Sequence, residues 1–534
     1  MARHFPVMSA ETYIPRLMPL RLPRICVAIT GTKPTEMISK AESLVRENPF
    51  IEFRLDYLPR PGTVFPLLKR FLEYHPEVVA IATCRRARNG GKFRGSVGAQ
   101  VDVLIRAADA GCQLVDLELQ SASQLKSADF QKIRSHAGLI LSFHDFHGTK
   151  DLDDTFDRML RVPADFFKIV TTATRLYDNV LMMKFLEQKS DRRSLIGVCM
   201  GQQGLISRIL GLRAGSVFTF AASSPGEETA PGQIAARTLR ETYRIEQVDA
   251  ATRVYGLVGD PVGHSLSPIM MNTAFRRESI NAVYLALQAK SLKDFMACVR
   301  DIPIHGFSVT MPYKEQIVQH LDNTDTFTEK TGACNTVIRA QNGKLYGFNT
   351  DVFGVLRPLE QRVVLPNARI LVIGAGGAAR AAVFGLRERN AQLFITNRSS
   401  GAGQKLAKQA RAKFIPRAAL RKMDFDVIIN ATPVGMSELP EKSAVSPLNE
   451  DEIRAKYLME MIYAPVETRL VRMARAKGVQ IISGAEMFVH QGARQFEIWT
   501  GKPAPFDEMY RVIYMVLTSR AAAAAAAAKK VGKK

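Results

Sequence analysis

Eight short apolar runs recur between residues 25 and 222, and this regular spacing constrains the fold more than any other feature. The runs are rich in β-branched residues, and helix-like stretches such as VDVLIRAADAG and DNVLMMKFLEQK separate most of them. Strands that alternate with helices predict a parallel sheet, and eight strands are the number that closes a (β/α)8 barrel. The runs are ICVAIT (25–30), IEFRLD (51–56), VVAIATC (78–84), QLVDLEL (113–119), GLILSFHD (138–145), DFFKIVT (165–171), SLIGVCM (194–200) and SVFTFAA (216–222).

Polar residues inside these runs are candidates for function, because barrel chemistry takes place at the C-terminal ends of the strands. Lys168 lies in FFKIVT between apolar neighbours. Apolar surroundings favour a neutral amine, which is a nucleophile that can form an imine with a ketone. The alternative is an edge lysine whose stem packs while its ammonium group reaches water.

Other polar residues of the barrel runs are placed for acid–base chemistry or for anion binding. His144 ends the run LILSFHD, where a general acid or base belongs. Arg85 follows the third run and Arg208 follows the seventh, in MGQQGLISR. Arginines that converge on a barrel mouth suit a carboxylated substrate.

Two runs carry alternating polar residues, which share one face of a strand. In IEFRLD these are Glu52, Arg54 and Asp56, and in DLEL they are Asp116 and Glu118. Barrel interiors also contain structural salt-bridge layers, and we assign Asp116 and Glu118 to this structural class.

The motif order ExRxD, DLEL, SFHDF, KIVT, GxxSR and APGQ resembles type I 3-dehydroquinate dehydratase over roughly residues 24–245. The resemblance implies that Lys168 forms an imine with the substrate ketone and that His144 removes the C2 proton and helps to expel the C1 hydroxyl as water, without a metal. It implies that the loop SSPGEETAPGQ closes over the substrate. The implied substrate-binding residues are Glu52, Arg54, Arg85, Arg208, Thr229 and Gln233.

The chain departs from this family's pattern at Asn89, in RRARNGG. The family often has a glutamate there, which can pair with the histidine. Loss of that carboxylate is expected to shift the pKa of the histidine, and therefore the pH optimum rather than the reaction.

A second region begins after a polar bridge at 237–253 with the segment YGLVGDPVGHSLSP. Ser265 and Ser267 lie two residues apart before a predicted helix, where hydroxyl and free amide groups can hold a carboxylate. A simple helix N-cap is the alternative for these serines.

The motifs GDPVGHSLSP, VTMPYK, GACNT and NTD occur in the order found in shikimate dehydrogenase, which the chain resembles over about 253–517 with its C-terminal HQGARQFEIWTG. The resemblance implies that Lys314 and Asp351 form a catalytic pair that delivers a proton to the developing alkoxide as hydride reaches the carbonyl. The substrate-positioning residues that it implies are Ser265, Ser267, Thr310, Asn335, Tyr463 and Gln491.

A dinucleotide fingerprint, Gly374-x-Gly376-x-x-Ala379, follows a strong strand and opens a helix. NAD-binding folds usually have an acidic residue after the next strand, but here that strand runs into Asn397 and Arg398. An arginine there can accept a 2′-phosphate, so we predict NADP; a merely solvated Arg398 is the alternative. The predicted cofactor-binding residues are Gly374, Ala375, Gly376, Gly377, Ala378, Asn397, Arg398 and Ser399.

The 534 residues are too many for one core and suggest about three domains. We predict an α/β protein, with an N-terminal (β/α)8 TIM barrel followed by a two-domain shikimate dehydrogenase that contains a Rossmann NADP-binding domain. The expected boundaries are 22–246 for the barrel, 252–356 for the substrate-binding domain, completed by helices at about 484–518, 357–483 for the Rossmann domain, and 519–534 for a disordered basic tail.

The composition of the chain limits the classes of molecule that it is expected to bind. The net charge of +22 is spread along the chain apart from the tail AAAAAAAAKKVGKK, and none of the known nucleic-acid motifs appears. We therefore expect small-molecule substrates, no nucleic acid and, without a run of about 18 apolar residues, no membrane span. Six scattered cysteines predict reduced thiols, no metal site and a cytoplasmic location. The sequence leaves the oligomeric state open.

The combined interpretation is a bifunctional shikimate-pathway enzyme. It would dehydrate 3-dehydroquinate to 3-dehydroshikimate and then reduce this product to shikimate with NADPH. One alternative is a dehydrogenase that uses quinate, and the paired serines favour shikimate over it. Another is an inactive metabolite-sensing homologue, which should have lost catalytic residues, whereas Lys168, His144, Lys314 and Asp351 are all present.

Overall fold

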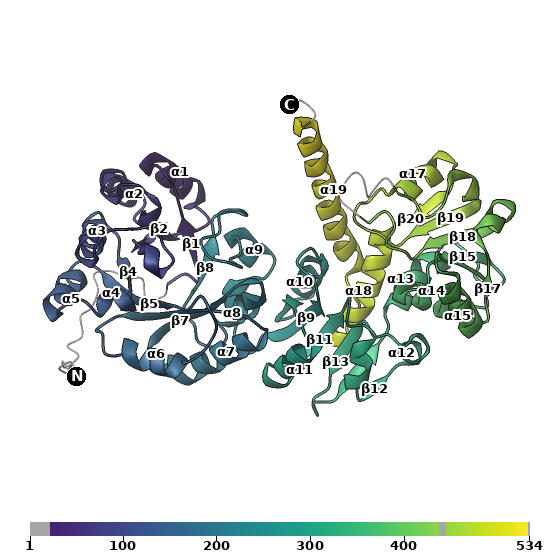
Figure 1. Ribbon diagram of the computed structural model, residues 1–534, viewed down its shortest axis with the longest axis horizontal. Coiled ribbons are helices and arrows are strands. Elements are labelled where there is room, and N and C mark those ends of the chain that lie inside the picture. Colours follow the sequence, from purple (N-terminus) through teal and green to yellow (C-terminus); the bar gives the residue numbers. More distant parts are fainter. Residues whose placement is uncertain (1–21, 437–444, 532–534) are drawn as a thin grey trace. The chain divides into compact units, whose positions relative to one another are not determined.

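The computed structural model describes residues 22–436 and 445–531, and these fold into two compact units (Figure 1). The first unit contains the chain up to residue 252 together with 287–302, and the second contains the remainder. Helix α11 (Leu292–Asp301), which the sequence places in the substrate-binding domain, is thus grouped with the first unit. Residues 437–444 of the predicted Rossmann domain and the last three residues of the predicted tail lie outside the described residues.

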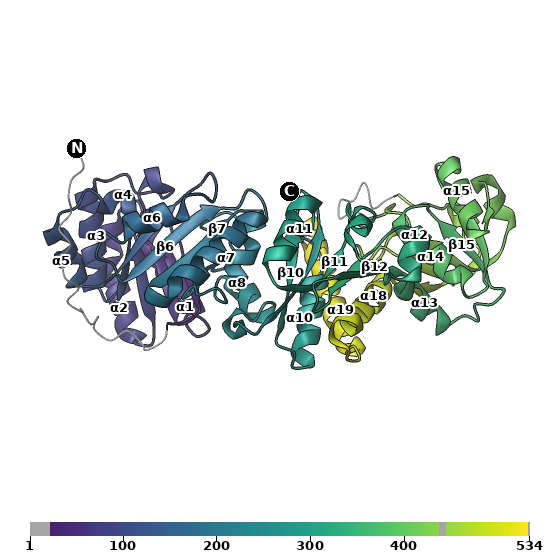
Figure 2. The same cartoon turned by 90° about the horizontal axis from the view of Figure 1, so that it is seen from below.

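The first unit is a nearly closed parallel barrel of eight strands in the order β7-β6-β5-β4-β3-β2-β1-β8 (Figures 1 and 2). A backbone hydrogen bond of 2.8 Å from Val217 N to Leu195 O links the chain just before β8 to β7. The strands are β1 (Ile25–Ile29), β2 (Phe50–Arg54), β3 (Val79–Thr83), β4 (Leu114–Glu118), β5 (Gly138–His144), β6 (Phe166–Thr172), β7 (Ser194–Met200) and β8 (Thr219–Ala222).

Helices follow the strands and surround the barrel (Figure 1). Their apolar faces are buried against the strands, as expected for helices that cover the outer face of a parallel barrel. The helices are α1 (Pro34–Leu44), α2 (Phe65–Tyr74), α3 (Val97–Asp109), α4 (Leu119–Ala122), α5 (Ser127–Arg134), α6 (Leu152–Met159), α7 (Tyr177–Lys189), α8 (Leu205–Leu210) and α9 (Ala236–Glu241).

The barrel interior changes from apolar to polar along the strands. Buried apolar side chains, including Phe50, Leu114, Ile140 and Phe166, pack together near the strand starts. Because alternate residues of a strand face the same side, the next interior positions are Glu52, Asp116, Ser142 and Lys168. The apolar layer therefore forms the floor of a polar site near the C-terminal ends of the strands.

The second unit begins with a six-stranded sheet in the order β10-β9-β11-β13-β14-β12. Strand β11 pairs parallel with β9 and antiparallel with β13, so the sheet is mixed. Its elements are β9 (Arg253–Gly259), α10 (Ser267–Arg277), β10 (Ala282–Gln288), β11 (Ile304–Val309), β12 (Asn323–Thr324), α12 (Thr326–Thr331), β13 (Thr336–Arg339) and β14 (Leu345–Phe348).

A second six-stranded sheet follows helix α13 (Asp351–Glu360), and all of its pairs are parallel. Its order, β17-β16-β15-β18-β19-β20, is the 3-2-1-4-5-6 order of a Rossmann fold. The elements are β15 (Arg369–Ile373), α14 (Gly377–Arg387), β16 (Gln392–Thr396), α15 (Ser400–Ala410), β17 (Lys413–Phe414), β18 (Phe425–Asn430), β19 (Ala455–Glu460), α17 (Arg469–Ala476) and β20 (Gln480–Ile482).

Helices α18 (Gly484–Thr500) and α19 (Phe506–Val531) return the chain to the first sheet of this unit. Phe496 and Trp499 of α18 and Ile513 of α19 belong to one buried cluster with Tyr255 of β9. The C-terminal helices therefore pack against the elements that begin the second unit.

The predicted disordered tail is wrong for residues 519–531, because α19 continues through them to Val531. Eight consecutive alanines begin at Ala521. Alanine has the highest intrinsic helix propensity, so a run of alanines extends an existing helix without needing a core of its own.

Candidate active sites

Lys168 lies inside the barrel rather than at an edge with its ammonium group in water, since it is only 5% exposed. Its Nζ donates a hydrogen bond of 3.0 Å to Asp116 Oδ2 and lies 3.8 Å from Glu52 Oε1. The same nitrogen is 3.7 Å from the ring centroid of Phe220, in the apolar floor. The lysine therefore faces an enclosed site with an apolar base and acidic walls.

Asp116 connects this lysine to the other candidate residues. Its Oδ1 accepts hydrogen bonds from Arg85 Nη2 at 2.9 Å and from Ser142 Oγ at 2.6 Å. Although burial raises the pKa of a carboxyl group, the charges of Arg85 and Lys168 hold the pKa of Asp116 well below its ordinary value. Asp116 is therefore an anion that balances two buried cations.

His144 is positioned by Arg85, whose Nη1 lies 2.8 Å from His144 Nδ1. Because a guanidinium group only donates, we assign Nδ1 as the acceptor, which leaves the proton of the neutral ring on Nε2. Burial, together with the charges of Arg85 and Lys168, lowers the pKa of His144 well below its usual value. The ring is therefore neutral at physiological pH.

The predicted arginines differ in their partners. Arg54 forms a two-pronged ion pair with Asp56, with both N–O distances at 3.0 Å, and Arg85 is paired with Asp116. Arg208 is 3% exposed, and in the described part of the chain its guanidinium group donates one hydrogen bond, of 3.2 Å to Pro231 O, and forms no ion pair with a carboxylate. Burial lowers the pKa of Arg208 to about 10. This buried, uncompensated cation is suited to a carboxylate of the substrate.

The loop after β8 carries Thr229 and Gln233, and these two residues bind each other. Gln233 Oε1 accepts from Thr229 N at 2.7 Å and from Thr229 Oγ1 at 3.1 Å. Pro231 O, between them, accepts from Gly201 N at 2.9 Å, at the end of β7. The loop therefore lies at the same end of the barrel as Arg208.

Asn89 is buried, and its Nδ2 has no hydrogen-bond partner among the described residues. No hydrogen bond joins it to His144 in this part of the chain. Its neighbour Gly90 packs on Phe146, whose ring stacks at 6.2 Å from that of His144. The segment that carries Asn89 is thus close to the histidine but supplies no carboxylate to it.

In the second unit, Lys314, Asp351 and Asn335 form one cluster. Lys314 Nζ lies 2.6 Å from Asp351 Oδ2, and Asn335 Nδ2 donates to Asp351 Oδ1 at 2.8 Å. Asp351 is the first residue of α13, where the helix dipole stabilises a carboxylate. The lysine is the more exposed partner, with 28% of its side chain accessible.

The serine pair begins α10, but Ser267 is the first helical residue and Leu266 has the N-cap position. Ser265 Oγ accepts from Ser267 N at 3.2 Å. Ser267 is buried. Gly259 ends the strand before the serine loop, and a Cβ there would lie 2.3 Å from Thr310 Cγ2, so the end of this strand is in contact with Thr310. A simple N-cap does not account for Ser267.

Gln491 and Tyr463 approach from the C-terminal part of this unit. Gly354 lies one turn after Asp351 in α13, and a Cβ there would lie 3.1 Å from Gln491 Cβ. Gln491 is held by a 2.8 Å bond from its Nε2 to Phe488 O, and the ring of Phe488 packs at 4.9 Å from that of Tyr463. The two predicted substrate residues are therefore linked through one turn of α18.

The glycine loop fits a dinucleotide. Gly374 has a φ of +120°, which side-chain residues rarely adopt, and Gly376 and Gly377 have no atom within 4 Å of where a Cβ would lie. Gly376 is the N-cap of α14, so Ala375 and Ala378 flank a helix N-terminus that is open to an anion.

The turn after β16 also fits the predicted cofactor. Asn397 Nδ2 donates to Ser399 O at 2.9 Å and shapes the turn, while Arg398 is exposed. No carboxylate occurs between Asn397 and Ser400 to bind a ribose 2′-hydroxyl. An exposed guanidinium group here is suited to a 2′-phosphate.

Metal sites and membrane spans are absent from the described part of the chain. It contains no group of three or more His, Cys, Asp or Glu residues that could hold a metal ion. No helix among the described residues has the length and apolar character needed to cross a membrane. All six cysteines are buried and free.

Family models match both halves of the chain. Residues 25–250 match type I 3-dehydroquinase. Residues 257–337 match the shikimate dehydrogenase substrate-binding domain, 359–466 match shikimate/quinate 5-dehydrogenase, and 484–514 match the shikimate 5′-dehydrogenase C-terminal domain.

One relative spans both halves. The bifunctional 3-dehydroquinate dehydratase/shikimate dehydrogenase, chloroplastic, of Arabidopsis thaliana is 33% identical over 515 residues, which cover 92% of this chain and 84% of that protein. The chain belongs to this bifunctional family. It is a multifunctional enzyme of the shikimate pathway, with a 3-dehydroquinate dehydratase (a lyase) and an NADP-dependent shikimate dehydrogenase (an oxidoreductase).

Other relatives match the dehydrogenase half. The shikimate dehydrogenase (NADP(+)) of Methanococcus maripaludis strain C6 is 40% identical over 265 residues, which are 48% of this chain and 94% of that protein. The crystal structure of shikimate 5-dehydrogenase from Thermus thermophilus in complex with NADP(H) and shikimate is 31% identical, with a TM-score of 0.46, and covers 49% of this chain and 99% of that one.

Two residues of the dehydratase and dehydrogenase sites were missed or misjudged from the sequence. Asp116, assigned a structural role, binds the candidate nucleophile directly. Gln495, which was not singled out, accepts from Ser308 Oγ at 2.9 Å and donates to Asn335 O at 3.3 Å. Its position one helical turn after Gln491 was the available signal.

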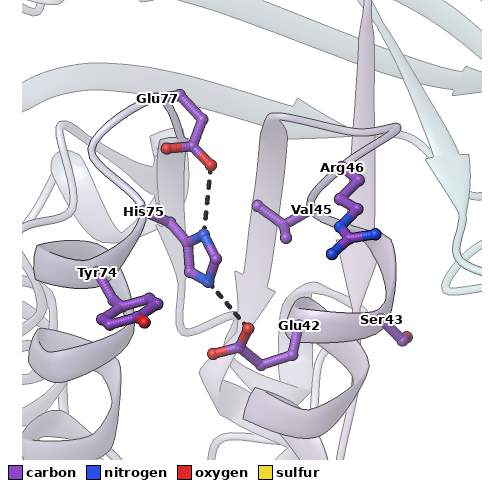
Figure 3. Close-up of a pocket in the computed structure, with 7 residues that line it drawn as sticks. All are labelled: Glu42, Ser43, Val45, Arg46, Tyr74, His75 and Glu77. Atoms are coloured by element: carbon purple, nitrogen blue, oxygen red, sulfur yellow. Dashed lines mark hydrogen bonds and ion pairs between the residues drawn. The ribbon is translucent and has the colours of Figure 1, made fainter.

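A further hollow of about 580 Å³ lies at the opposite end of the dehydratase barrel, where strands β2 and β3 begin. His75 bridges Glu42 at 2.9 Å and Glu77 at 3.3 Å there (Figure 3). Burial lowers the pKa of His75, but the two carboxylates raise it more, so the net shift is upward. This end of a barrel stabilises the fold, and the catalytic candidates lie at the other end.

Proposed function

We propose that the dehydratase reaction takes place at Lys168. The ammonium group of Lys168 passes one proton to Asp116, to which it is hydrogen-bonded, and the resulting amine attacks the ketone of 3-dehydroquinate. The same proton then leaves with the former ketone oxygen as water, and a protonated imine links the substrate to the enzyme. The imine draws electrons from the adjacent carbon, so His144 can remove the C2 proton and return a proton to the departing C1 hydroxyl. Hydrolysis of the imine then releases 3-dehydroshikimate and restores the lysine.

The observation that supports this role is the enclosure of Lys168 by Asp116, Glu52 and the ring of Phe220. An enclosed amine over an apolar floor excludes water from the imine while the carboxylates orient the nitrogen. We propose that Glu52, Thr229 and Gln233 contact the hydroxyl groups of the substrate.

His144 must be freed from Arg85 before it can act as a base, because Nδ1 is occupied and Nε2 carries the proton in this arrangement. We propose that the incoming substrate draws Arg85 away from the ring. Arg208 binds the carboxylate, since it is the buried arginine without an acidic partner among the described residues. Arg54, whose charge Asp56 already balances, contacts the hydroxyl groups of the substrate rather than its carboxylate.

At the second site, we propose that Lys314 and Asp351 act as a pair on the carbonyl of 3-dehydroshikimate. Their 2.6 Å contact places a proton donor beside a carboxylate that Asn335 orients. Lys314 donates a proton to the oxygen as it becomes an alkoxide. Ser265, Ser267, Thr310, Asn335, Gln491 and Tyr463 hold the ring and its carboxylate.

NADPH, when bound, supplies the hydride. We propose that the N-terminus of α14, with Gly374, Ala375, Gly376, Gly377 and Ala378, holds the pyrophosphate and that Asn397, Arg398 and Ser399 hold the 2′-phosphate. Comparison of KM for NADPH and NADH, in the wild type and in Arg398→Ala, tests this assignment. A large preference for NADPH that the variant loses supports it, and equal constants in the wild type contradict it.

The role of Lys168 has a direct test. Borohydride reduces an imine to a stable amine, so adding it during turnover of 3-dehydroquinate should fix the ligand to the peptide that contains Lys168, as read by mass spectrometry. The variant His144→Ala, which retains the lysine, should still be labelled. Label elsewhere, or none in the wild type, would contradict the assignment.

We further propose that both activities operate in the cytoplasm on small molecules, without nucleic acid or membrane partners. The net charge of +22 then serves anionic substrates and a phosphorylated cofactor. Retention on heparin but no saturable binding of duplex DNA at physiological salt is the expected result.

A further inference from the structure

Glu460, at the end of β19, is a buried carboxylate that neither reaction described above uses. It is 1% exposed, and in the described residues no lysine, arginine or histidine forms an ion pair with it. A buried charge without a counter-ion is costly and needs several hydrogen bonds to persist. Its position at the carboxyl edge of a parallel sheet is where ligands bind in Rossmann folds.

The carboxylate is surrounded by neutral donors. Oε1 accepts from Asn430 Nδ2 at 2.9 Å and from the backbone N–H of Ile462 at 3.2 Å. Oε2 accepts from Thr468 Oγ1 at 2.9 Å. Thr468 Oγ1 also accepts a hydrogen bond of 3.2 Å from Val471 N, and its hydroxyl proton is the one that it donates to Glu460. This set of donors fits an anion, which only accepts, better than a protonated acid.

On one side, the carboxylate shapes the turn that touches the glycine loop. Asn430 Oδ1 accepts from Thr432 N at 3.1 Å and from Thr432 Oγ1 at 2.7 Å. A Cβ at Gly374 would lie 3.0 Å from Ala431 O and 3.1 Å from Thr432 Cγ2. The turn at 430–432 is therefore in contact with the first glycine of the fingerprint.

On the other side, the carboxylate fixes the segment that carries a candidate substrate residue. Ile462 and Thr468, which both bind Glu460, bracket Tyr463. A Cβ at Gly484 would lie 2.8 Å from Tyr463 N, so this segment is also packed against the start of α18. One carboxylate thus joins the loops that follow two neighbouring strands.

We propose that Glu460 is a positioning residue of the dehydrogenase, whose carboxylate holds the 430–432 turn against the glycine loop and the 461–468 segment beside Tyr463, and so sets the affinity for the dinucleotide. This inference depends on the proposed assignment of the glycine loop to the cofactor.

The role has a pH signature. Burial raises the pKa of Glu460 to about 7. The anion that the donors require is therefore present above about pH 7 and is replaced by the neutral acid as the pH falls. The groups that face Glu460 from β18, from the 461–468 segment and from α17 are the side chains of Asn430 and Thr468 and the amides of Met461 and Ile462, none of which titrates in this range. Dinucleotide affinity should weaken on acidification for this reason.

The test compares KM for NADPH and kcat of the full-length dehydrogenase between pH 6 and 8.5 in the wild type, Glu460→Gln and Glu460→Asp. The side-chain amide of glutamine would place an N–H group among groups that also donate, so one hydrogen bond is lost. KM for NADPH should therefore rise about tenfold at pH 8, which is the effect expected when one hydrogen bond to a charged group is lost. The glutamine variant cannot titrate, so its KM should lose the acid dependence. Aspartate keeps the charge and should recover part of the affinity and the pH profile.

Glu452→Gln is the matched control. Glu452 is 2% exposed and lies just before β19, at the opposite edge of the same sheet, where it is paired with Arg417. Its loss should lower stability without changing KM for NADPH, and the dehydrogenase kcat of every variant at saturating NADPH reports that the second unit is folded.

A KM for Glu460→Gln equal to that of the wild type at all pH values, or no greater than that of Glu452→Gln, would overturn the inference. Should the glutamine variant fail to fold, an aspartate variant with wild-type KM and no acid dependence would overturn it instead. A wild-type chain that cannot oxidise NADPH with 3-dehydroshikimate would refute the proposed function, which is a different outcome.

Discussion

His144 lies beside the cations of Arg85 and Lys168, whose effect together with burial outweighs that of the Asp116 carboxylate, and this arrangement determines the protonation of the ring. Burial, Arg85 and Lys168 all lower its pKa. A base must be neutral to accept a proton, so the acid limb of the dehydratase profile should lie well below pH 6.5.

Asn89→Glu should shift that limb. A carboxylate on the segment that packs on Phe146 would stabilise the imidazolium and raise the pKa of His144. As the pH is lowered, dehydratase kcat/KM should therefore begin to fall at a higher pH than in the wild type. The pH–rate profile measures this shift. Ala87→Glu, which adds the same single negative charge at an exposed position of the same segment, is the control, and an identical shift in both variants would show that position 89 has no specific effect.

Asp116 is the counter-ion for Lys168 and Arg85, and its removal should be severe. Asp116→Asn leaves two buried cations partly unbalanced and should lower the free energy of unfolding of the barrel by about 3 kcal/mol. Dehydratase kcat should fall about a hundredfold because the amine loses its orientation. Denaturant unfolding and both enzymatic assays measure these effects; a variant with normal dehydratase kcat would contradict the role.

Particular residues show what the sequence could and could not predict. Glu52, Lys168 and His144 were identifiable because each interrupts an apolar strand. The Asp116–Lys168 contact joins residues 52 positions apart and depends on the register across β4, β5 and β6, which no local pattern encodes. Glu460 carries no local signal beyond its place at a strand end, and its function depends on donors from Asn430 and Thr468.

At the scale of elements, the loop after β8 is tied to α1 by one ammonium group. Lys40 Nζ lies 2.7 Å from Glu227 Oε1, 3.2 Å from Glu36 Oε1 and 3.1 Å from Thr30 O. Glu227 also accepts a short hydrogen bond from Ser223 Oγ. Three acceptors satisfy the three protons of Lys40, so the loop that carries Thr229 and Gln233 is anchored to the end of β1.

Breaking this anchor should weaken substrate binding more than the chemistry. Lys40→Met and Glu227→Gln should each raise KM for 3-dehydroquinate about threefold to tenfold, and the double variant should be no worse than either single variant. Lys69→Met is the control, because Lys69 belongs to an exposed i,i+4 pair on α2. Additive effects in the double variant would show that the two residues act separately.

Helix α19 divides into a packed part and an alanine extension. Met509, Ile513 and Leu517 are buried in the cluster that α18 and α10 share, whereas the alanine run begins after them. Truncation after Arg520 should therefore leave both activities intact. Truncation before Phe506 should remove the packed part and abolish dehydrogenase activity. Loss of either activity in the shorter truncation, measured by steady-state assays, would reveal a role for the tail.

At the scale of the whole molecule, the barrel and the Rossmann sheet were predictable because long periodic patterns encode them. The structure of the tail was not predictable in this way. Its low-complexity composition indicates that the segment cannot form a core, but it does not indicate whether the segment can extend an existing helix. The grouping of α11 with the first unit likewise depends on tertiary contacts rather than on strand order.

The central claim is that one chain performs two consecutive reactions at two separate sites, one built on Lys168 and the other on Lys314 with Asp351. The most direct measurement follows the absorbance of NADPH with purified protein and 3-dehydroquinate, beside Lys168→Ala and Lys314→Ala. The wild type should oxidise NADPH, Lys168→Ala should do so only when 3-dehydroshikimate is supplied, and Lys314→Ala should accumulate 3-dehydroshikimate. A wild type that is silent with both substrates would contradict the claim and would favour a metabolite-binding homologue without catalysis.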